Sequence, residues 1–119
     1  MSRSIDIVDL LDSGIKAEGL RQRAISSNVA NIETPGYRRL DVRFEQLLAK
    51  ALKSGRQTNL YDIPPELYEP ANTPIRSNGN DVNMEAEIGE MVKNSLRQTA
   101  YVRLMQKKLA QIERAVDIR

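Results

Sequence analysis

The sequence contains no cysteine and no histidine. Without cysteine, the chain can form no disulfide, no thiolate metal site and no thiol nucleophile. Histidine is the commonest general base and the commonest metal ligand, so its absence removes the usual acid–base and metal chemistry. Tryptophan is also absent and phenylalanine occurs once, at Phe44, so any core is mainly aliphatic. We therefore expect a protein that is not an enzyme, with no catalytic residue, no metal site and no cofactor.

Long apolar runs are missing as well. No run approaches the roughly 18 apolar residues that a membrane-spanning helix needs. The opening stretch, "MSRSIDIVDLLDSG", carries Asp6, Asp9 and Asp12 where a signal peptide would be apolar. Taken alone, these signals predict a cytosolic protein, and 119 residues correspond to a single domain.

The net charge is +2, but charges of opposite sign gather in different parts of the chain. Lysine and arginine dominate residues 38–56 and 91–119, whereas aspartate and glutamate dominate residues 57–90. A nucleic-acid site would combine a basic face with interleaved aromatic side chains. The basic stretches lack such aromatic side chains, so the sequence does not support base stacking. We expect solvated helix faces and complementary charges between neighbouring subunits, with no nucleic-acid partner.

The C-terminal third has an apolar repeat of seven residues, read in alternate steps of four and three from Met84. This repeat predicts a helix over residues 84–119 that packs along its length on a partner helix with a left-handed twist. Asn83 is placed to cap its start. The predicted seam contains six apolar residues of this helix: Ile88, Met91, Val102, Met105, Leu109 and Ile112.

A shorter apolar stripe predicts an N-terminal helix over residues 1–33. Val8, Leu11 and Ile15 begin the stripe, and Ile25 and Val29 resume it in the same phase. We expect this helix and the C-terminal helix to lie antiparallel, as a coiled-coil-like hairpin in a mainly α fold.

Between its two apolar parts, the positions of the N-terminal stripe are occupied by the polar residues Glu18 and Gln22. In an antiparallel pair these residues fall near Ser95, Gln98 and Thr99, which predicts a polar layer that sets the register of the two helices. In the alternative interpretation, Leu20 and Ala24 rotate inward and the polar groups stay in water.

The region from residue 34 to residue 83 should hold a turn, one short helix and an irregular stretch rich in proline and asparagine. Apolar residues between Leu40 and Leu52 predict an amphipathic helix of about 13 residues that ends at Gly55. Four later prolines forbid a continuous helix. The candidates for a short β-hairpin are Asn59–Ile63 and Pro74–Arg76.

The stretch "SSNVANIETPGYRR" ends the first helix in an unusual way. Asn28 and Asn31 lie three residues apart on one helix face, and an asparagine amide can both donate and accept hydrogen bonds. In Thr34-Pro35-Gly36-Tyr37, proline suits the second position of a type II turn, and glycine suits the positive φ of the third. We expect the asparagines to bind the following turn or a neighbouring subunit.

This stretch resembles the N-terminal signature of the bacterial flagellar rod and hook family, in which Asn-x-x-Asn precedes Thr-Pro-Gly-Tyr. The stretch "NGNDVNMEAEIGEMVKNSLRQTAY" is similar to the family's C-terminal signature, especially at Asn94, Ser95 and Leu96. Distal rod and hook proteins are much longer, so the resemblance is greatest to the short proximal rod subunits. Residues 40–77 show little similarity.

The resemblance implies a structural subunit of the helical rod, which transmits torque from the membrane ring to the distal rod and hook. It implies export through the flagellar type III secretion apparatus without a cleaved signal, and assembly in the periplasm, which replaces the cytosolic prediction. The implied partners are other rod proteins, base-ring and rod-adaptor proteins, copies of the same chain and the export apparatus, with no small-molecule substrate.

Three alternatives remain. The first is another short proximal rod subunit of the same family. The second is a helical-hairpin adaptor or chaperone unrelated to flagella, which would explain the apolar repeats but not the turn. The third is an enzyme or cation site at Glu85, Glu87 and Glu90, but a single helix supplies all three carboxylates.

A second, partly apolar row follows the C-terminal seam at Val92, Leu96, Ala100 and Leu104. The row can pack on neighbouring subunits, or on the predicted 40–52 helix of the same chain.

Overall fold

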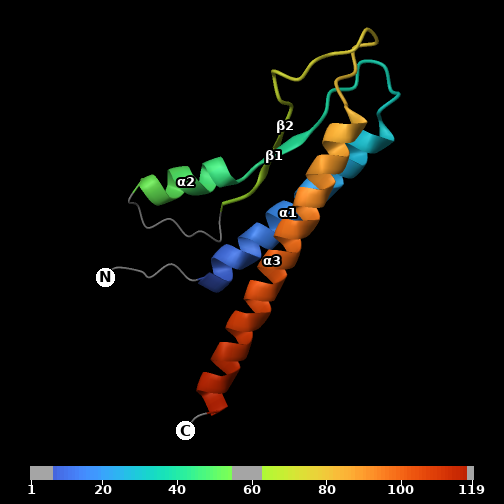
Figure 1. Ribbon diagram of the computed structural model, residues 1–119. Coiled ribbons are helices and arrows are strands. Elements are labelled where there is room, and N and C mark those ends of the chain that lie inside the picture. Colours follow the sequence, from blue (N-terminus) through green and yellow to red (C-terminus); the bar gives the residue numbers. More distant parts are fainter. Residues whose placement is uncertain (1–6, 55–62, 118–119) are drawn as a thin grey trace.

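The computed structural model describes residues 7–54 and 63–117 and contains two long helices with a small lobe beside them (Figure 1). In chain order the elements are α1 (Ile7–Ala30), β1 (Asp41–Arg43), α2 (Glu45–Lys53), β2 (Glu66–Tyr68) and α3 (Met84–Asp117). α1 and α3 run antiparallel along each other, which confirms the mainly α fold and the helical hairpin. The radius of gyration is 18.0 Å, against about 13.5 Å for a compact domain of this length, so the molecule is elongated.

Both predicted long helices are present, and the end of α1 and the start of α3 are the two boundaries that can be compared with the prediction. The Asn83 side chain caps α3, because its Oδ1 accepts a hydrogen bond from the Ala86 N–H at 3.0 Å. α1 ends at Ala30 and a turn covers residues 31–33, which were predicted to be helical. Residues 1–6 and 118–119 lie outside the described residues.

The short helix is shorter than predicted and begins later. α2 starts at Glu45, and the residues before it form β1. The side chains of Leu40, Val42 and Phe44 alternate in sequence and are half-buried or buried, a spacing of two that fits a strand. The predicted end at Gly55 lies outside the described residues.

The predicted β-hairpin strands are wrong where they can be compared. β1 pairs antiparallel with β2, with Val42 opposite Leu67, and Ile63 is not in a strand. Residues 59–62 lie outside the described residues. The 74–76 segment has no regular secondary structure and leads into a turn at residues 77–78, across which the Arg76 N–H donates to the Asn80 carbonyl at 2.8 Å. Pro74 has no N–H to give to a strand ladder.

The apolar core lies between α1 and the small lobe, which contains β1, α2 and β2. Ala17 and Ala24 of α1 pack there with Val42, Phe44 and Ile63. Partly buried side chains surround this cluster: Leu10, Leu20, Leu40, Leu47, Leu48 and Ala51. The alternative in which Leu20 and Ala24 face the second long helix is therefore wrong.

α3 turns a different row toward α1 than the apolar repeat predicted. Glu87 and Asn94 are buried and Tyr101 is half-buried, one position before the predicted seam and so rotated by about 100° around the helix. The α1 half of the seam is packed, with Leu11 and Ile25 buried. Val8, Ile15 and Val29 are half-buried. On α3 only Met105 is half-buried, and the other seam residues are exposed: Ile88, Met91, Val102, Leu109 and Ile112.

The second row of α3 is exposed as well. Val92, Leu96, Ala100 and Leu104 all face solvent in the single chain, so they do not pack on α2. Leu96 is 67% exposed.

We predict that Phe44→Ala lowers the free energy of unfolding by about 3 kcal/mol or more, because truncating a buried phenylalanine leaves a cavity. Phe44 is only 2% exposed. Urea unfolding followed by circular dichroism measures the change. The matched control is Leu52→Ala on α2, where the leucine is 49% exposed. Equal losses for the two variants would mean that Phe44 is not a core residue.

Candidate functional site

The turn after α1 has the geometry of the predicted type II turn. Gly36 has a φ of +75°, and the Tyr37 N–H donates to the Thr34 carbonyl at 3.3 Å. A positive φ at the third position is what this turn type requires. The turn therefore reverses the chain at one end of the hairpin, and we call this end the tip (Figure 1).

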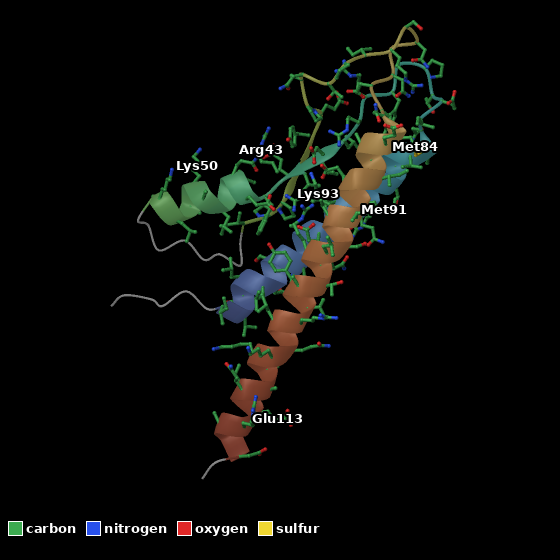
Figure 2. The ribbon with its side chains drawn as sticks, in the orientation of Figure 1. Arg43, Lys50, Met84, Met91, Lys93 and Glu113 are labelled. Carbon is green, nitrogen blue, oxygen red and sulfur yellow. The ribbon has the colours of Figure 1, made fainter. Side chains whose placement is uncertain are left out.

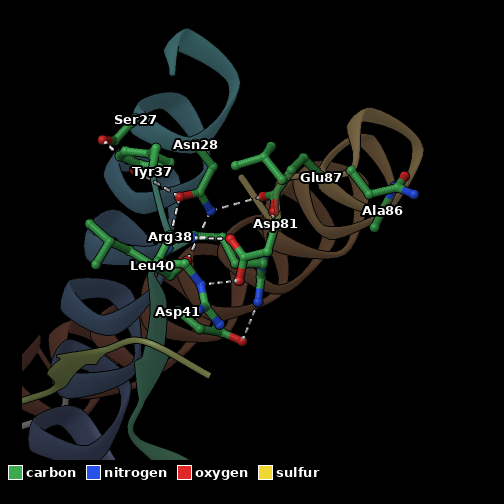
Figure 3. Close-up of polar contacts among 12 residues, drawn as sticks. Ser27, Asn28, Tyr37, Arg38, Leu40, Asp41, Asp81, Ala86 and Glu87 are labelled. Atoms are coloured by element: carbon green, nitrogen blue, oxygen red, sulfur yellow. Dashed lines mark hydrogen bonds and ion pairs between the residues drawn. The ribbon is translucent and has the colours of Figure 1, made fainter. Parts of the chain in front are cut away.

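Asn28 joins three segments through one buried amide (Figure 3). Its Nδ2 donates to the Leu40 carbonyl at 2.9 Å and to a Glu87 oxygen at 3.2 Å. Its Oδ1 accepts from the Leu40 N–H at 2.8 Å and from the Tyr37 hydroxyl at 3.1 Å. One side chain thus holds α1, the segment after the turn and α3 together.

The Asn31 side chain makes local hydrogen bonds. Its Nδ2 donates to the Ser27 carbonyl at 2.9 Å, and its Oδ1 accepts from the Thr34 hydroxyl at 3.1 Å. These bonds satisfy polar groups at the end of α1. The two asparagines therefore differ in function: Asn28 links segments and Asn31 closes the helix end.

A second loop, over residues 76–81, fastens the turn from the other side. The Asn80 amide is buried and donates to the carbonyls of Asn31 and Thr34, each at 2.8 Å. The Gly36 N–H donates to the Asn78 carbonyl at 2.9 Å. Residues 31–36 and 78–80 therefore form one joint.

Two glycines make this joint possible. Gly79 has a φ of +85°, and a Cβ built on it would lie 3.2 Å from the Gly36 Cα. A side chain at Gly79 would press on the backbone of the turn, and the positive φ would strain any residue with a Cβ. The stretch "SNGND" predicts a turn from its residue types, but no local pattern indicates that Gly79 and Asn80 contact the turn after α1.

Beneath the joint, two arginines neutralise two buried carboxylates (Figure 3). Arg39 Nε donates to Glu87 at 2.8 Å, and the Arg39 N–H donates to Asp81. Arg38 Nε donates to Asp81 at 3.2 Å. Burial alone would lower the pKa of Arg39, but the hydrogen bond and charge of Glu87 raise that pKa above its usual value. The guanidinium stays charged, so the buried carboxylate keeps its partner.

The polar layer midway along the hairpin forms at Glu18, as predicted, but with different partners. Glu18 is fully buried, and one of its carboxylate oxygens accepts from Asn94 Nδ2 at 3.1 Å and from Arg97 Nε at 2.9 Å. Arg21 bridges Glu18 to Glu45 at the start of α2. Gln22 is exposed and takes no part.

The shift in partners follows from the rotation of α3. A buried carboxylate costs several kcal/mol unless hydrogen bonds and an opposite charge compensate it. Asn94 and Arg97 supply both, whereas Ser95 and Thr99 are uncharged and exposed.

Burial alone would lower the pKa of Arg21, but the hydrogen bond to Glu45 and the charges of Glu18 and Glu45 raise that pKa.

Next to this layer Tyr101 of α3 packs on a glycine of α1. A Cβ built on Gly14 would lie 2.8 Å from Tyr101 Cζ, so the ring rests on the glycine backbone. Burial and the nearby carboxylates of Glu18 and Glu45 raise the pKa of Tyr101. Gly14 and Tyr101 are 87 residues apart in the chain, so no local sequence pattern indicates this contact.

Of the predicted C-terminal signature, only Asn94 lies in this interface, while Ser95 and Leu96 are exposed.

Among the described residues, every buried polar side-chain atom has a hydrogen-bond partner. No group of carboxylates in the described ranges could hold a metal ion. Within the same ranges, no helix combines the length and apolar character that a bilayer crossing needs.

The surface of α3 differs from its buried side. Met84 and Glu113 lie near its two ends in Figure 2, and apart from the half-buried Met105 both apolar rows are exposed along it. A shallow groove of about 370 Å³ runs along this surface over Ser95, Gln98, Thr99, Val102, Arg103 and Gln106. A helix with exposed apolar rows is suited to packing against other helices.

Comparison with known proteins places this architecture in context. A family model described as flagella basal body rod protein matches residues 11–38, which contain the Asn28–Tyr37 motif. The flagellar basal body rod protein FlgB of Bacillus subtilis (strain 168) is 27% identical over 114 residues, which cover 88% of each chain. The FlgB protein of Buchnera aphidicola subsp. Acyrthosiphon pisum (strain APS) is 32% identical over 65% of this chain and 68% of its own length. The FlgB protein of Yersinia enterocolitica is 30% identical over 65% of this chain and 69% of its own.

We predict opposite effects for two glycine-to-alanine changes in α1. Gly19→Ala should raise the free energy of unfolding by about 1 kcal/mol, because alanine is the better helix former and nothing lies within 4 Å of the new Cβ. Gly14→Ala should lower it by about 1 kcal/mol or more, because overpacking against Tyr101 outweighs the same gain. Chemical unfolding of both variants measures the difference. A stabilising Gly14→Ala would mean that Tyr101 does not press on α1.

Proposed function

The chain belongs to the family of flagellar basal body rod proteins of the FlgB type and is a structural subunit of the proximal rod, and we propose that its exposed α3 rows bind neighbouring subunits. The observation that supports this proposal is the exposure of apolar residues on a helix whose buried row is largely polar. Burying one leucine-sized side chain contributes about 1.5–3 kcal/mol. Several such residues on each subunit are a substantial driving force for assembly.

The tip supplies the rigid end that such a subunit needs. Torque passes through a rod only if its subunits do not bend at their connections. Asn28, Asn80 and the paired glycines tie the reversal of the chain to both long helices. Asn31, Thr34, Pro35, Gly36 and Tyr37 therefore act in assembly by holding the tip in one shape.

The subunit associates with other rod components and with copies of itself in the basal body. We extend this to base-ring and rod-adaptor proteins at its lower boundary and to the export apparatus during secretion. Export without a cleaved signal and assembly in the periplasm complete the proposal. A small, mainly aliphatic core supports it, because such a core is only marginally stable and unfolds readily for threading. Catalysis forms no part of this role.

We predict that a chain with Ile88→Glu and Leu109→Glu folds but does not support rod assembly. Both residues are about half exposed, at 51% each, so the free energy of unfolding should change by about 0.5 kcal/mol or less per site. In a strain lacking the gene, this variant should leave basal bodies with a base ring and no rod, as imaged after purification. The wild-type gene should restore the rod.

The matched control adds the same two negative charges on α2, with Gln46→Glu and Ala49→Glu at exposed positions. This control should restore the rod. A complete rod built with the Ile88/Leu109 variant would contradict the role of the α3 rows. A complete rod in the deletion strain itself would contradict the function as a rod subunit.

We predict that Gly36→Val blocks rod assembly while the protein is still exported. Space does not limit this change, because nothing lies within 4 Å of a Cβ at Gly36. The φ of +75° is the obstacle, since a β-branched residue there is strained by about 1–3 kcal/mol. Gly36→Asn is the matched control, because asparagine tolerates this conformation. Equal assembly of both variants, measured as motility and rod completion, would show that the turn geometry is not required.

A further inference from the structure

Arg21 lies on α1 between the two surfaces that this helix buries. Glu18, three residues earlier, is buried against α3, whereas Ala17 and Ala24 pack on the small lobe. The Arg21 guanidinium donates from Nη1 to Glu18 and from Nη2 to Glu45, the first residue of α2. One side chain therefore contacts both the interface with α3 and the lobe.

α2 has little else to hold it on the long helices. None of its residues is buried, and Leu47, Leu48 and Ala51 only border the apolar core. Among the described residues, its one ion pair with either long helix is the pair between Glu45 and Arg21. The position of α2 therefore depends on where the Arg21 guanidinium is held.

α3 determines where this guanidinium is held. With α3 in place, Glu18 is fully buried, so protein groups and not water must compensate its charge. Arg21 is one of these groups, and its side chain is only 11% exposed. If α3 moved away, water could solvate Glu18, and the contact between Arg21 and Glu45 would become an exposed ion pair, which contributes little to stability.

The charge of α3 also acts on α2. Burial alone would raise the pKa of Glu45, but the hydrogen bond from Arg21 and the positive charges of Arg21 and Arg97 hold that pKa below its usual value. Arg97 belongs to α3 and Glu45 to α2. The two elements therefore interact electrostatically where Arg21 joins them.

We propose that Arg21 is a positioning residue that couples the docking of α3 on α1 to the docking of the small lobe on α1. The planar guanidinium suits this role, because its donors hold two carboxylates in a fixed geometry, whereas the ammonium group of a lysine is a flexible point charge. The lobe takes its final position only when α3 is docked. This coupling acts within one chain and does not depend on the contacts between subunits proposed above.

Hydrogen exchange of the full-length chain, followed by mass spectrometry, tests the link to the lobe. Arg21→Lys keeps a positive charge beside Glu18 but loses the fixed geometry. The amides of α2 should exchange about tenfold faster than in the wild type, because α2 then opens more often. The matched control is Arg23→Lys, the same change at an exposed position of α1, which should leave the exchange of α2 unchanged.

A change on α3 tests the coupling itself. Asn94→Ala removes a hydrogen bond to the Glu18 carboxylate at a residue outside α2. In the wild-type chain it should speed the exchange of α2 amides about fivefold, because a loosened α3 releases Arg21. In a chain that already carries Glu45→Ala, the same change should alter the exchange of α2 by less than about twofold, because the path through Arg21 is then broken.

Circular dichroism verifies that each variant keeps its helices. If Asn94→Ala does not, Arg97→Gln replaces it, because Arg97 bonds the same oxygen of Glu18 from a more exposed position. The proposal is wrong if Arg21→Lys affects α2 no more than Arg23→Lys does, or if the α2 amides of the wild type already exchange like those of an unfolded chain. It is also wrong if the α3 change has the same effect on α2 with and without Glu45→Ala.

Discussion

The structure depends on a charge that is buried between two helices. Glu18 lies fully inside the α1–α3 interface, where an unpaired carboxylate would cost several kcal/mol. Asn94 and Arg97 must therefore face α1, together with Arg21 from α1 itself. This requirement fixes the rotation of α3 about its axis. Near the tip, Glu87 of α3 is also buried, and Asn28 and Arg39 compensate its charge by hydrogen bonds.

The rotation has a direct consequence for function. Because polar residues occupy the side of α3 that meets α1, its apolar residues lie on the outside, where a single chain cannot bury them. Register comes from hydrogen bonds and ion pairs, which are directional and therefore specific. Apolar area, which is not directional, stays exposed on α3. In the assembly proposed above, the intramolecular and intermolecular interfaces would use different kinds of interaction.

The joint at the tip shows the same division on a smaller scale. Gly36 and Gly79 allow two backbone segments to touch, and Asn28 and Asn80 hold them by hydrogen bonds. The joint is separate from the apolar core, which is small and lies around Phe44. The hydrogen-bonded shape of the tip can therefore be maintained in a subunit whose core is small, which suits the export and assembly proposed above.

Local patterns in the sequence predicted the two long helices, their antiparallel pairing and the turn at Gly36, because apolar spacing and turn residues act over short distances. They also located a polar layer at Glu18. Which row of α3 meets α1, which residues pair with Glu18, and where the strands lie follow from contacts between distant parts of the chain. Those outcomes depend on the partners of Asn28, Glu18 and Gly14, which are 59 to 87 residues away in the chain. The apolar repeat could not reveal them, because a helix that assembles with other subunits carries the same repeat whether its partner belongs to its own chain or to the next one.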